Sequence, residues 1–175
     1  LPGLGLQLPR TVLTESEALR VMAAADLTSA FGIRDRAILE LFYSSGIRRL
    51  ELIFLQISDM DFRNGFVYVR YGKGRRQRKV PIGESASGFI LRYLSEVRPN
   101  LLKKRDDGWL FLSRWGRRLS KQRLYKIVKH YLHEADIHRP GACHIFRHSM
   151  ATHMMRNGAS SRHLQEMLGH SQISL

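Results

Sequence analysis

The chain has 175 residues, of which 43% are hydrophobic, and this length favours a single globular domain that can bury an apolar core. The sequence holds no apolar run near the roughly 18 residues of a membrane-spanning helix, and its opening LPGLGLQLPR is unlike a signal peptide. Cys143 is the one cysteine, which excludes an internal disulfide and a cysteine-rich zinc site. With neither a spanning run nor a signal peptide, we expect a cytoplasmic location. The 29 Lys and Arg residues exceed the 15 Asp and Glu residues by 14, which favours a polyanionic partner.

The N-terminal part is predicted to begin with an arm and to continue in helices. Residues 1–12 mix Gly, Pro and Leu without periodicity, so we expect a linker or an arm that arrives from something upstream. Thr14 and Glu17 fit a capping box that opens a helix over about residues 15–25. The segment RDRAILELFYSSG predicts a second helix that stops at Gly46, and IRRLELIFLQ predicts a short third helix directly after it.

The middle of the chain is predicted to hold short strands around a basic turn. The β-rich segments FVYVRY and RKVPI flank GKGRRQ, which indicates a hairpin with a glycine-containing loop. Residues 85–97 are expected to be helical until Pro99, and WLFLS at residues 109–113 is expected to be a further strand. These strands would form a small antiparallel sheet.

The C-terminal part is predicted to consist of three helices. In SKQRLYKIVKHYLHEADI, apolar residues repeat at helical spacing from Leu124 to Ala135, which predicts one packed face and one basic face. HIFRHSMATHMMRNG predicts a helix closed by Asn157 and Gly158, and SSRHLQEMLG predicts one closed by Gly169. Some seven helices and about three strands predict an α+β fold that is mainly α, with a small antiparallel three-stranded sheet.

Nucleic acid is favoured over a membrane surface as the polyanion. A membrane-surface protein would carry one long amphipathic helix with a basic face, whereas here the basic residues are spread over several predicted elements. YGKGRRQRK is not a nucleoside triphosphate loop, because a glycine rather than Ser or Thr follows Lys73, so ATP is not expected. A basic hairpin tip can instead enter a groove of DNA and contact phosphates, although each charge alone is equally consistent with a solvated turn.

The stretch HIFRHSM holds the clearest candidates for chemistry. His144 and Arg147 are three residues apart and would share one helix face near a helix N-terminus, an arrangement that suits a phosphate. His144 and His148 have the spacing of a metalloprotease pair, but Ile145 stands where such a site needs Glu, and Arg147 would repel a dication. We therefore expect no metal, and a packing or supporting role for His148 and His153.

The segments SGIRRLEL, YGKGRRQRKVPI, HIFRHSMATHMM and LGHSQIS together resemble a known family. They occur in the order and approximate separations of the catalytic domain of the tyrosine recombinases, the phage integrases and Xer-like site-specific recombinases. The resemblance covers about residues 12–175. It implies the DNA breaking-rejoining fold, cleavage of double-stranded DNA through a 3′-phosphotyrosyl intermediate without metal or ATP, and a homotetramer on two duplexes. A bacterial, phage or mobile-element origin is also implied.

The resemblance implies a role for each matching residue. The catalytic residues that match by position are Arg48, Lys73, His144, Arg147 and His170. Glu51 matches an acidic residue that supports the first arginine, whereas by itself its spacing from Arg48 would indicate a local ion pair. Two guanidiniums can clamp the nonbridging oxygens, and the hairpin lysine can bring a proton to the leaving oxygen. Further DNA contacts are expected from Arg75, Arg76, Arg78, Lys79, Lys121 and Lys126.

The nucleophile is the one part of the resemblance that this sequence does not match. The family carries a tyrosine shortly after the LGH histidine, but residues 171–175 contain none. The six tyrosines are upstream, where packing, strand propensity or DNA contact explains them: Tyr43, Tyr68, Tyr71, Tyr93, Tyr125 and Tyr131. The resemblance therefore implies that residues 1–12 are a linker or arm from an N-terminal DNA-binding domain, and that residues 13–175 are a catalytic domain whose nucleophile lies beyond residue 175. The alternative is a noncatalytic DNA-binding module or regulatory relative with the same phosphate pocket, whereas a metal-dependent nuclease would need clustered carboxylates.

Overall fold

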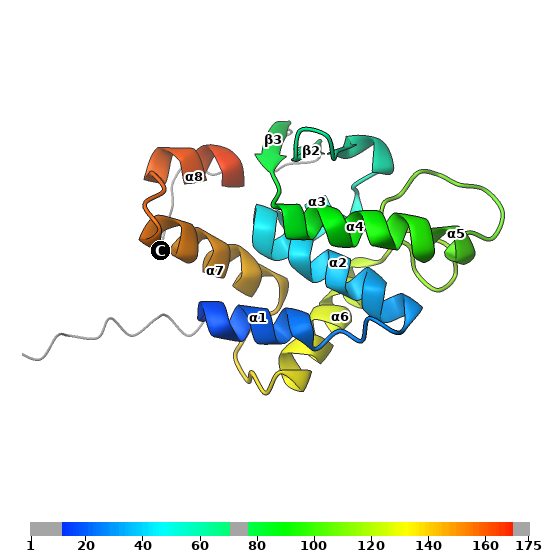
Figure 1. Cartoon of the computed structure of the whole chain (residues 1–175), viewed down its shortest axis with the longest axis horizontal. Helices are drawn as coiled ribbons and strands as arrows, with labels where there is room; N and C mark the ends of the chain where they lie inside the picture. The colour runs from blue at the N-terminus through cyan, green and yellow to red at the C-terminus, as the bar shows by residue number, and fades with distance from the viewer. Residues whose placement is uncertain (1–11, 71–76, 170–175) are drawn as a thin grey trace, which may run out of the picture.

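Helix α2 lies at the centre of the fold, with α4 on one side and α1 on the other (Figure 1). The structure is a computed structural model that describes residues 12–70 and 77–169. In these residues the elements are, in chain order, α1 (Glu15–Ala23), α2 (Ala30–Ser45), α3 (Arg49–Ile53), the 3₁₀ helix η1 (Ile57–Asp59), β1 (Met60–Asp61), β2 (Phe66–Val69), β3 (Arg78–Pro81), α4 (Glu84–Glu96), α5 (Arg98–Leu101), α6 (Lys121–Glu134), α7 (Cys143–Arg156) and α8 (Ser161–Leu168). The predicted fold class, mainly α with a small antiparallel sheet, is confirmed.

The central helix is buried on nearly all sides because its sequence is apolar around most of its circumference. Ile38, Leu39, Leu41 and Phe42 follow one another closely and are all fully buried, which is the pattern of a core helix rather than a surface helix. The helix begins four residues before the predicted start, because the Ser29 hydroxyl caps it by accepting the N–H of the third helical residue at 2.9 Å. Its packing against α4 and α7 places its C-terminal end beside the catalytic candidates.

The helices that flank the core follow the predicted patterns closely. The capping box of α1 is present, because Thr14 Oγ1 accepts from the Glu17 N–H at 3.0 Å and Glu17 Oε1 accepts from the Thr14 N–H at 3.2 Å. In α6 the predicted apolar stripe is the buried face, whereas Lys121 and Lys126 are exposed. The helices predicted around HIFRHSM and LQEML are α7 and α8.

The small sheet has the strand order β1-β2-β3, and both pairs are antiparallel. The two predicted hairpin strands are confirmed as an antiparallel pair. Val67 pairs with Val80 and both are fully buried, whereas Tyr68 between the buried valines is exposed. The loop that joins the strands, with Lys73, Arg75 and Arg76, lies outside the described residues.

The prediction of a strand at residues 109–113 is wrong. This segment makes only isolated bridges, Gln56 with Trp109 and Leu112 with Arg118, and the third strand of the sheet is β1 instead. The backbone N–H groups of the segment bond to scattered partners, Leu110 to the Leu55 carbonyl at 2.8 Å and Leu112 to the Tyr93 hydroxyl at 2.9 Å. Its consecutive apolar side chains are buried together, so the segment is a core-filling loop rather than an alternating strand.

None of the helices in residues 12–70 and 77–169 is long and apolar enough to cross a bilayer.

The turn after α2 depends on a glycine. Gly46 has φ +64°, and a Cβ there would collide with Met150 Cε and approach Leu168 Cδ2 at 2.8 Å. We predict that Gly46→Ala lowers the free energy of unfolding by about 2 kcal/mol or more, because left-handed backbone strain adds to a clash in the core. Gly88→Ala is the matched control, since nothing lies within 4 Å of its added methyl in α4, and it should raise stability by up to about 1 kcal/mol. Urea denaturation of both variants checks this, and equal effects would contradict the proposed strain.

Candidate active site

Three helices, α3, α6 and α7, meet around a cavity of about 300 Å³. The start of α3 contributes Arg48 and Arg49, the start of α7 contributes His144 and Arg147, and α6 contributes Tyr125. The glycine turn at the end of α2 leads the chain directly into α3, which explains why two arginines can face α7. Four of these five side chains can carry positive charge, and so the cavity suits an anion.

A buried carboxylate organises one wall of this cavity. Glu51, which is 3% exposed, accepts the Arg48 backbone N–H at 2.8 Å and so caps α3. Its two oxygens also receive the guanidinium of Arg78 from β3, at 2.5 and 2.8 Å, and Arg48 Nη1 lies 3.7 Å away. Burial raises the pKa of Glu51, but the hydrogen bonds from Arg78 and from the Arg48 backbone outweigh it, so the pKa lies below its ordinary value. Glu51 is therefore charged at neutral pH.

Arg147 is the most deeply buried charge of the cavity. It is 6% exposed, and it donates from Nη1 to the Gly46 carbonyl at 2.6 Å and from Nη2 to the Leu168 carbonyl at 2.7 Å. Burial and the nearby charge of Arg48 lower the pKa of Arg147 to about 10, and Glu51 offsets only part of this. The guanidinium is still protonated at neutral pH, so a buried cation with incomplete compensation faces the cavity, where a bound anion would stabilise it.

The two histidines beside Arg147 differ in position. His144 is exposed at the start of α7 and lines the cavity, and its ring packs against Gly141, where a Cβ would lie 2.5 Å from Nε2. The ring of His148 lies edge-on to that of His144, with centroids 5.8 Å apart. Burial, then the charges of His144 and Arg147, lower the pKa of His148, which keeps its imidazole neutral at neutral pH. His148 thus lies next to the cavity without lining it.

The structure brings together four of the predicted site residues and changes the expected role of another. Arg48, Glu51, His144 and Arg147 converge, whereas Lys73 and His170 lie outside the described residues. Arg78 was expected to contact DNA, but its guanidinium is committed to Glu51 and to the Met167 carbonyl, with Nε donating at 2.9 Å. Lys79 is exposed, and its ammonium lies 4.0 Å from the Phe66 ring centroid.

Two cavity residues were not expected from the sequence, Arg49 and Tyr125. Tyr125 stands on the side of α6 away from the apolar stripe and is 40% exposed. An exposed aromatic residue on the basic face of a helix was the signal that could have identified it.

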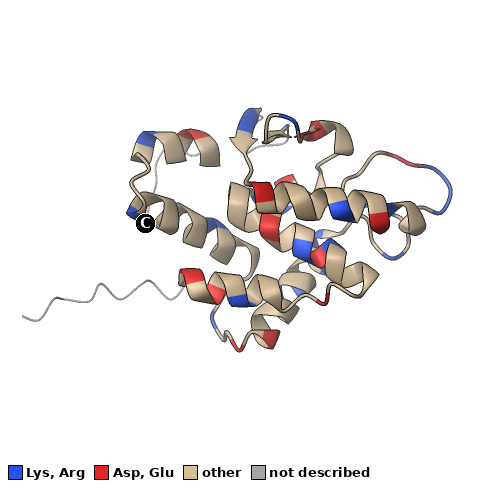
Figure 2. Cartoon of the chain, in the orientation of Figure 1, with Lys and Arg blue, Asp and Glu red and all other residues tan. Residues whose placement is uncertain are grey.

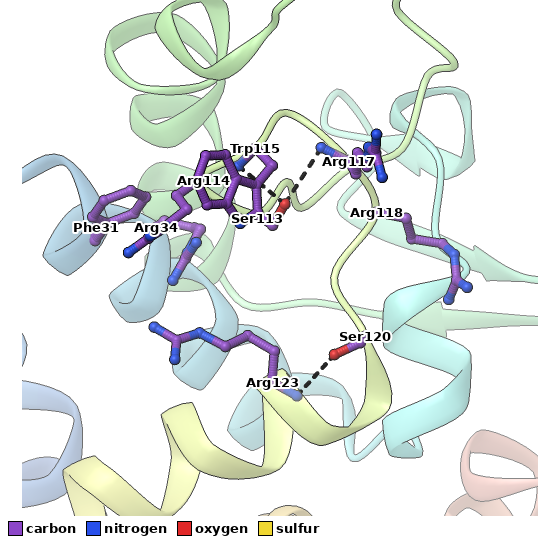
Figure 3. A pocket seen from close by; sticks show the side chains of 9 residues that line it. All are labelled: Phe31, Arg34, Ser113, Arg114, Trp115, Arg117, Arg118, Ser120 and Arg123. Carbon is purple, nitrogen blue, oxygen red and sulfur yellow. Dashed lines mark hydrogen bonds between the residues drawn. The ribbon is translucent and has the colours of Figure 1, made fainter.

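A second, larger cavity of about 600 Å³ lies between α2, α6 and the loop at residues 113–118 (Figure 3). Figure 3 shows Arg34 and Arg123 extending toward the same space from the two helices, with Trp115 on the loop side. Trp115 is 64% exposed and stacks under the Arg114 guanidinium at 4.5 Å.

Residues 108–133 contain seven Lys and Arg residues and no Asp or Glu, whereas the first turns of α1 and α4 carry acidic residues (Figure 2). The surface from this cavity along α6 is therefore strongly cationic.

The side chains that usually bind metal ions do not cluster in the part of the chain that the structure describes. In residues 12–70 and 77–169, no three His, Cys, Asp or Glu side chains lie close enough together to hold a metal ion. Cys143 lies in the wall of the smaller cavity, where burial raises the pKa of its thiol to about 11, so the thiol is protonated at neutral pH.

Comparisons with known proteins agree on one family. The Phage integrase family matches residues 11–175. The chain is 43% identical over 174 residues to tyrosine recombinase XerC 2 of Ralstonia nicotianae, covering 99% of this chain and 50% of that protein. It is 44% identical over 163 residues to tyrosine recombinase XerD of Staphylococcus epidermidis, covering 93% and 55% respectively. The chain thus spans about half the length of the curated relatives that it matches.

Solved structures show the same likeness. The crystal structure of XerA recombinase superimposes with a TM-score of 0.80 at 30% identity, covering 92% of this chain and 56% of that one. The pre-cleavage complex of XerH site-specific recombinase with its difH substrate gives a TM-score of 0.79 at 26% identity, covering 94% and 48%. The two comparisons agree that nearly the whole of this chain shares its fold with recombinases, one of which is bound to its substrate.

The charge of Glu51 should matter to stability in a pH-dependent way. Because its pKa is lowered in the folded state, the charged form contributes stability above the ordinary value of 4.5, and this is lost as the pH falls through the folded-state pKa. We predict that Glu51→Gln costs about 3 kcal/mol at neutral pH, because two arginines lose a buried partner, and that the difference shrinks below pH 4.5.

Urea denaturation over a pH series measures this difference. Glu166→Gln is the matched control, because Glu166 is 69% exposed in a surface pair with Arg162 and should change stability by less than about 0.5 kcal/mol. A difference between Glu51→Gln and the unaltered chain that stays constant with pH would contradict the charged role of Glu51.

Proposed function

The chain belongs to the Phage integrase family, and on that premise we propose that it is the catalytic domain of a tyrosine-type site-specific DNA recombinase. It cleaves and rejoins double-stranded DNA by transesterification through a 3′-phosphotyrosyl intermediate. The observation that carries this proposal is the cavity in which Arg48, His144 and the buried Arg147 face one space. Such a cavity fits a phosphodiester whose negative charge grows during the reaction.

The two arginines have distinct parts in this scheme. Attack on phosphorus places additional charge on the nonbridging oxygens, and guanidiniums fixed in advance stabilise that charge without reorganising. Arg147 is fixed by the Gly46 and Leu168 carbonyls, and the Arg48 backbone is fixed by the Glu51 cap. The scheme therefore places the phosphate between the start of α3 and the start of α7.

The reaction needs a nucleophile and a proton donor. A tyrosine hydroxyl gives its proton to a neighbouring base, His144 or His170 in this scheme, and its oxygen forms the new bond to phosphorus. The bond to the 5′ oxygen breaks, and that oxygen takes a proton from Lys73. The ester keeps the energy of the broken bond, so neither ATP nor metal is part of the scheme. We place the nucleophile beyond residue 175, as in the sequence hypothesis. Among tyrosines in the described residues, Tyr125 is the one that lines this cavity and is the alternative to test.

The duplex extends beyond the phosphate that reacts. We place its backbone along the basic face of α6 and over the second cavity, where Arg114 and Arg123 are exposed cations, with Lys121, Lys126, Lys79 and the hairpin loop as further contacts. Phosphate contacts of this kind position the protein without specifying sequence. The proposal includes a homotetramer on two duplexes, acting in the cytoplasm. A noncutting DNA-binding module with the same cavity remains the competing function.

DNA binding through phosphates predicts a strong salt dependence. If the chain neutralises roughly six phosphates, the logarithm of the affinity should fall with the logarithm of salt concentration at a slope of about −5 to −6. The double variant Arg114→Glu, Arg123→Glu should make the slope less negative by about two for every duplex sequence tested, because each lost phosphate contact removes about 0.9 from its magnitude. Lys104→Glu, Arg105→Glu is the control with the same change of charge on another exposed loop. Fluorescence anisotropy titrations measure the slopes, and equal slopes for both double variants would refute this DNA path.

A covalent adduct decides between cutting and noncutting functions. We predict that the 175-residue chain forms no adduct with a nicked suicide substrate, and that a version extended by its natural following residues does, as judged on a denaturing gel. Tyr125→Phe in the extended version should keep the adduct. A band from the 175-residue chain that Tyr125→Phe abolishes would instead make Tyr125 the nucleophile. No band from the extended version on its proper site would favour the noncutting module.

A further inference from the structure

The side of α7 that faces away from the cavity holds the first described residues of the chain. The backbone N–H of Leu13 donates to Ser149 Oγ at 2.9 Å, and His153 Nε2 donates to the Leu13 carbonyl at 2.8 Å. Leu13 is 0% exposed and Val12 is 3% exposed, so both bonds are shielded from water. We call these three residues, Leu13, Ser149 and His153, the Leu13 clamp. One backbone unit is thereby held at both of its polar groups by a single helix.

The clamp continues into the central helix through His153. Because a carbonyl can only accept, His153 Nε2 carries the proton and Nδ1 accepts from the Tyr43 hydroxyl at 2.6 Å. Burial, then the charge of Glu15, raises the pKa of Tyr43, which keeps the phenol protonated as a donor. Tyr43 is three residues before Gly46, whose carbonyl receives Arg147. The hydrogen bonds therefore run from Leu13 through α7 to Tyr43 on α2, and the last turn of α2 connects Tyr43 to the Gly46 carbonyl that accepts from Arg147.

The clamp and the cavity use different faces of α7. Ser149 and His153 are four residues apart and share a face, whereas Arg147 is about 200° around the helix from Ser149. Neither clamp side chain lines the cavity, so neither can touch a phosphate there. A helix bonded on both faces cannot rotate or slide without breaking one of the two sets of contacts, and it therefore transmits the position of residues 12–13 to Arg147.

We propose that Ser149 and His153 are positioning residues, which fix the rotation of α7 so that Arg147 and His144 meet the phosphate. The proposal rests on the function proposed above. It explains why this face of α7 carries a buried histidine and a buried serine, with Tyr43 of α2 against the histidine, where apolar side chains would fill the space. A fully satisfied polar network specifies one arrangement, whereas apolar packing tolerates several.

The test compares hydroxyl deletions inside and outside the network. In the extended, tyrosine-containing protein, Tyr43→Phe and Ser149→Ala should lower the single-turnover cleavage rate at saturating DNA by about tenfold, because displacement of a catalytic group by about 1 Å can cost about a hundredfold. The dissociation constant should stay within about twofold. Tyr93→Phe is the matched control, because its buried hydroxyl also makes one hydrogen bond, to the Leu112 N–H, but on α4. It should leave the rate of folded protein unchanged.

Conservative rescue and a second readout complete the experiment. His153→Leu should lose cleavage, and His153→Gln, which can still donate to the Leu13 carbonyl, should recover most of it. In the 175-residue chain, the NMR signal of the Arg147 Nε–H should shift in Tyr43→Phe and Ser149→Ala and stay in place in Tyr93→Phe. The NMR measurement tests the positioning role of Ser149 and His153 even if the extended protein forms no adduct. A missing adduct would overturn only the proposed function. Equal rate losses in Tyr43→Phe and Tyr93→Phe, or an unmoved Arg147 signal, would overturn the positioning role.

Discussion

The cavity depends on the ion pairing of one buried carboxylate with arginines from two separate segments. Glu51 caps α3 through the Arg48 N–H and receives the guanidinium of Arg78 from β3, so it joins the helical body to the sheet. Gathering Arg48, Arg78 and Arg147 in one place would otherwise be opposed by their mutual repulsion and by burial. The carboxylate compensates part of that charge and leaves the remainder for an anion. Structural support and the proposed binding of phosphate thus depend on the same balance of charges.

The helices were predictable because their signals are local. Thr14 and Glu17 form their capping box within one turn, and the stripe of α6 lies on one face of a continuous segment. The strands of the sheet were harder to predict from the sequence. Met60 and Asp61 are too few to show any periodicity, and the apolar run at residues 109–113, typical of a buried strand, serves the core as a loop. Its hydrogen-bond partners, among them the Tyr93 hydroxyl, are chosen by tertiary packing, which no local pattern contains.

The candidate site was predictable where its residues belong to recognisable sequence motifs. Arg48, His144 and Arg147 were identified with a family, and the structure places them around one cavity. The sequence could not show that Arg78 turns inward to Glu51, since 27 residues separate the two. Nor could it show that Leu13 bonds to a serine 136 residues away. These contacts depend on how α2, α7 and β3 pack, and single polar residues carry no periodic signal of their partners.

Arg147 illustrates why structure and chemistry are inseparable at this site. The carbonyls that hold it belong to the C-cap of α2 and the last residue of α8, where the helix dipole is negative and backbone oxygens lack helical partners. The guanidinium satisfies both helix ends and is still charged at neutral pH, although burial and the charge of Arg48 lower its pKa to about 10. A lysine could supply the charge, but a single ammonium cannot span two carbonyls and still offer a fixed, planar set of donors to a phosphate. The fold therefore requires arginine at the position where phosphate chemistry also requires it.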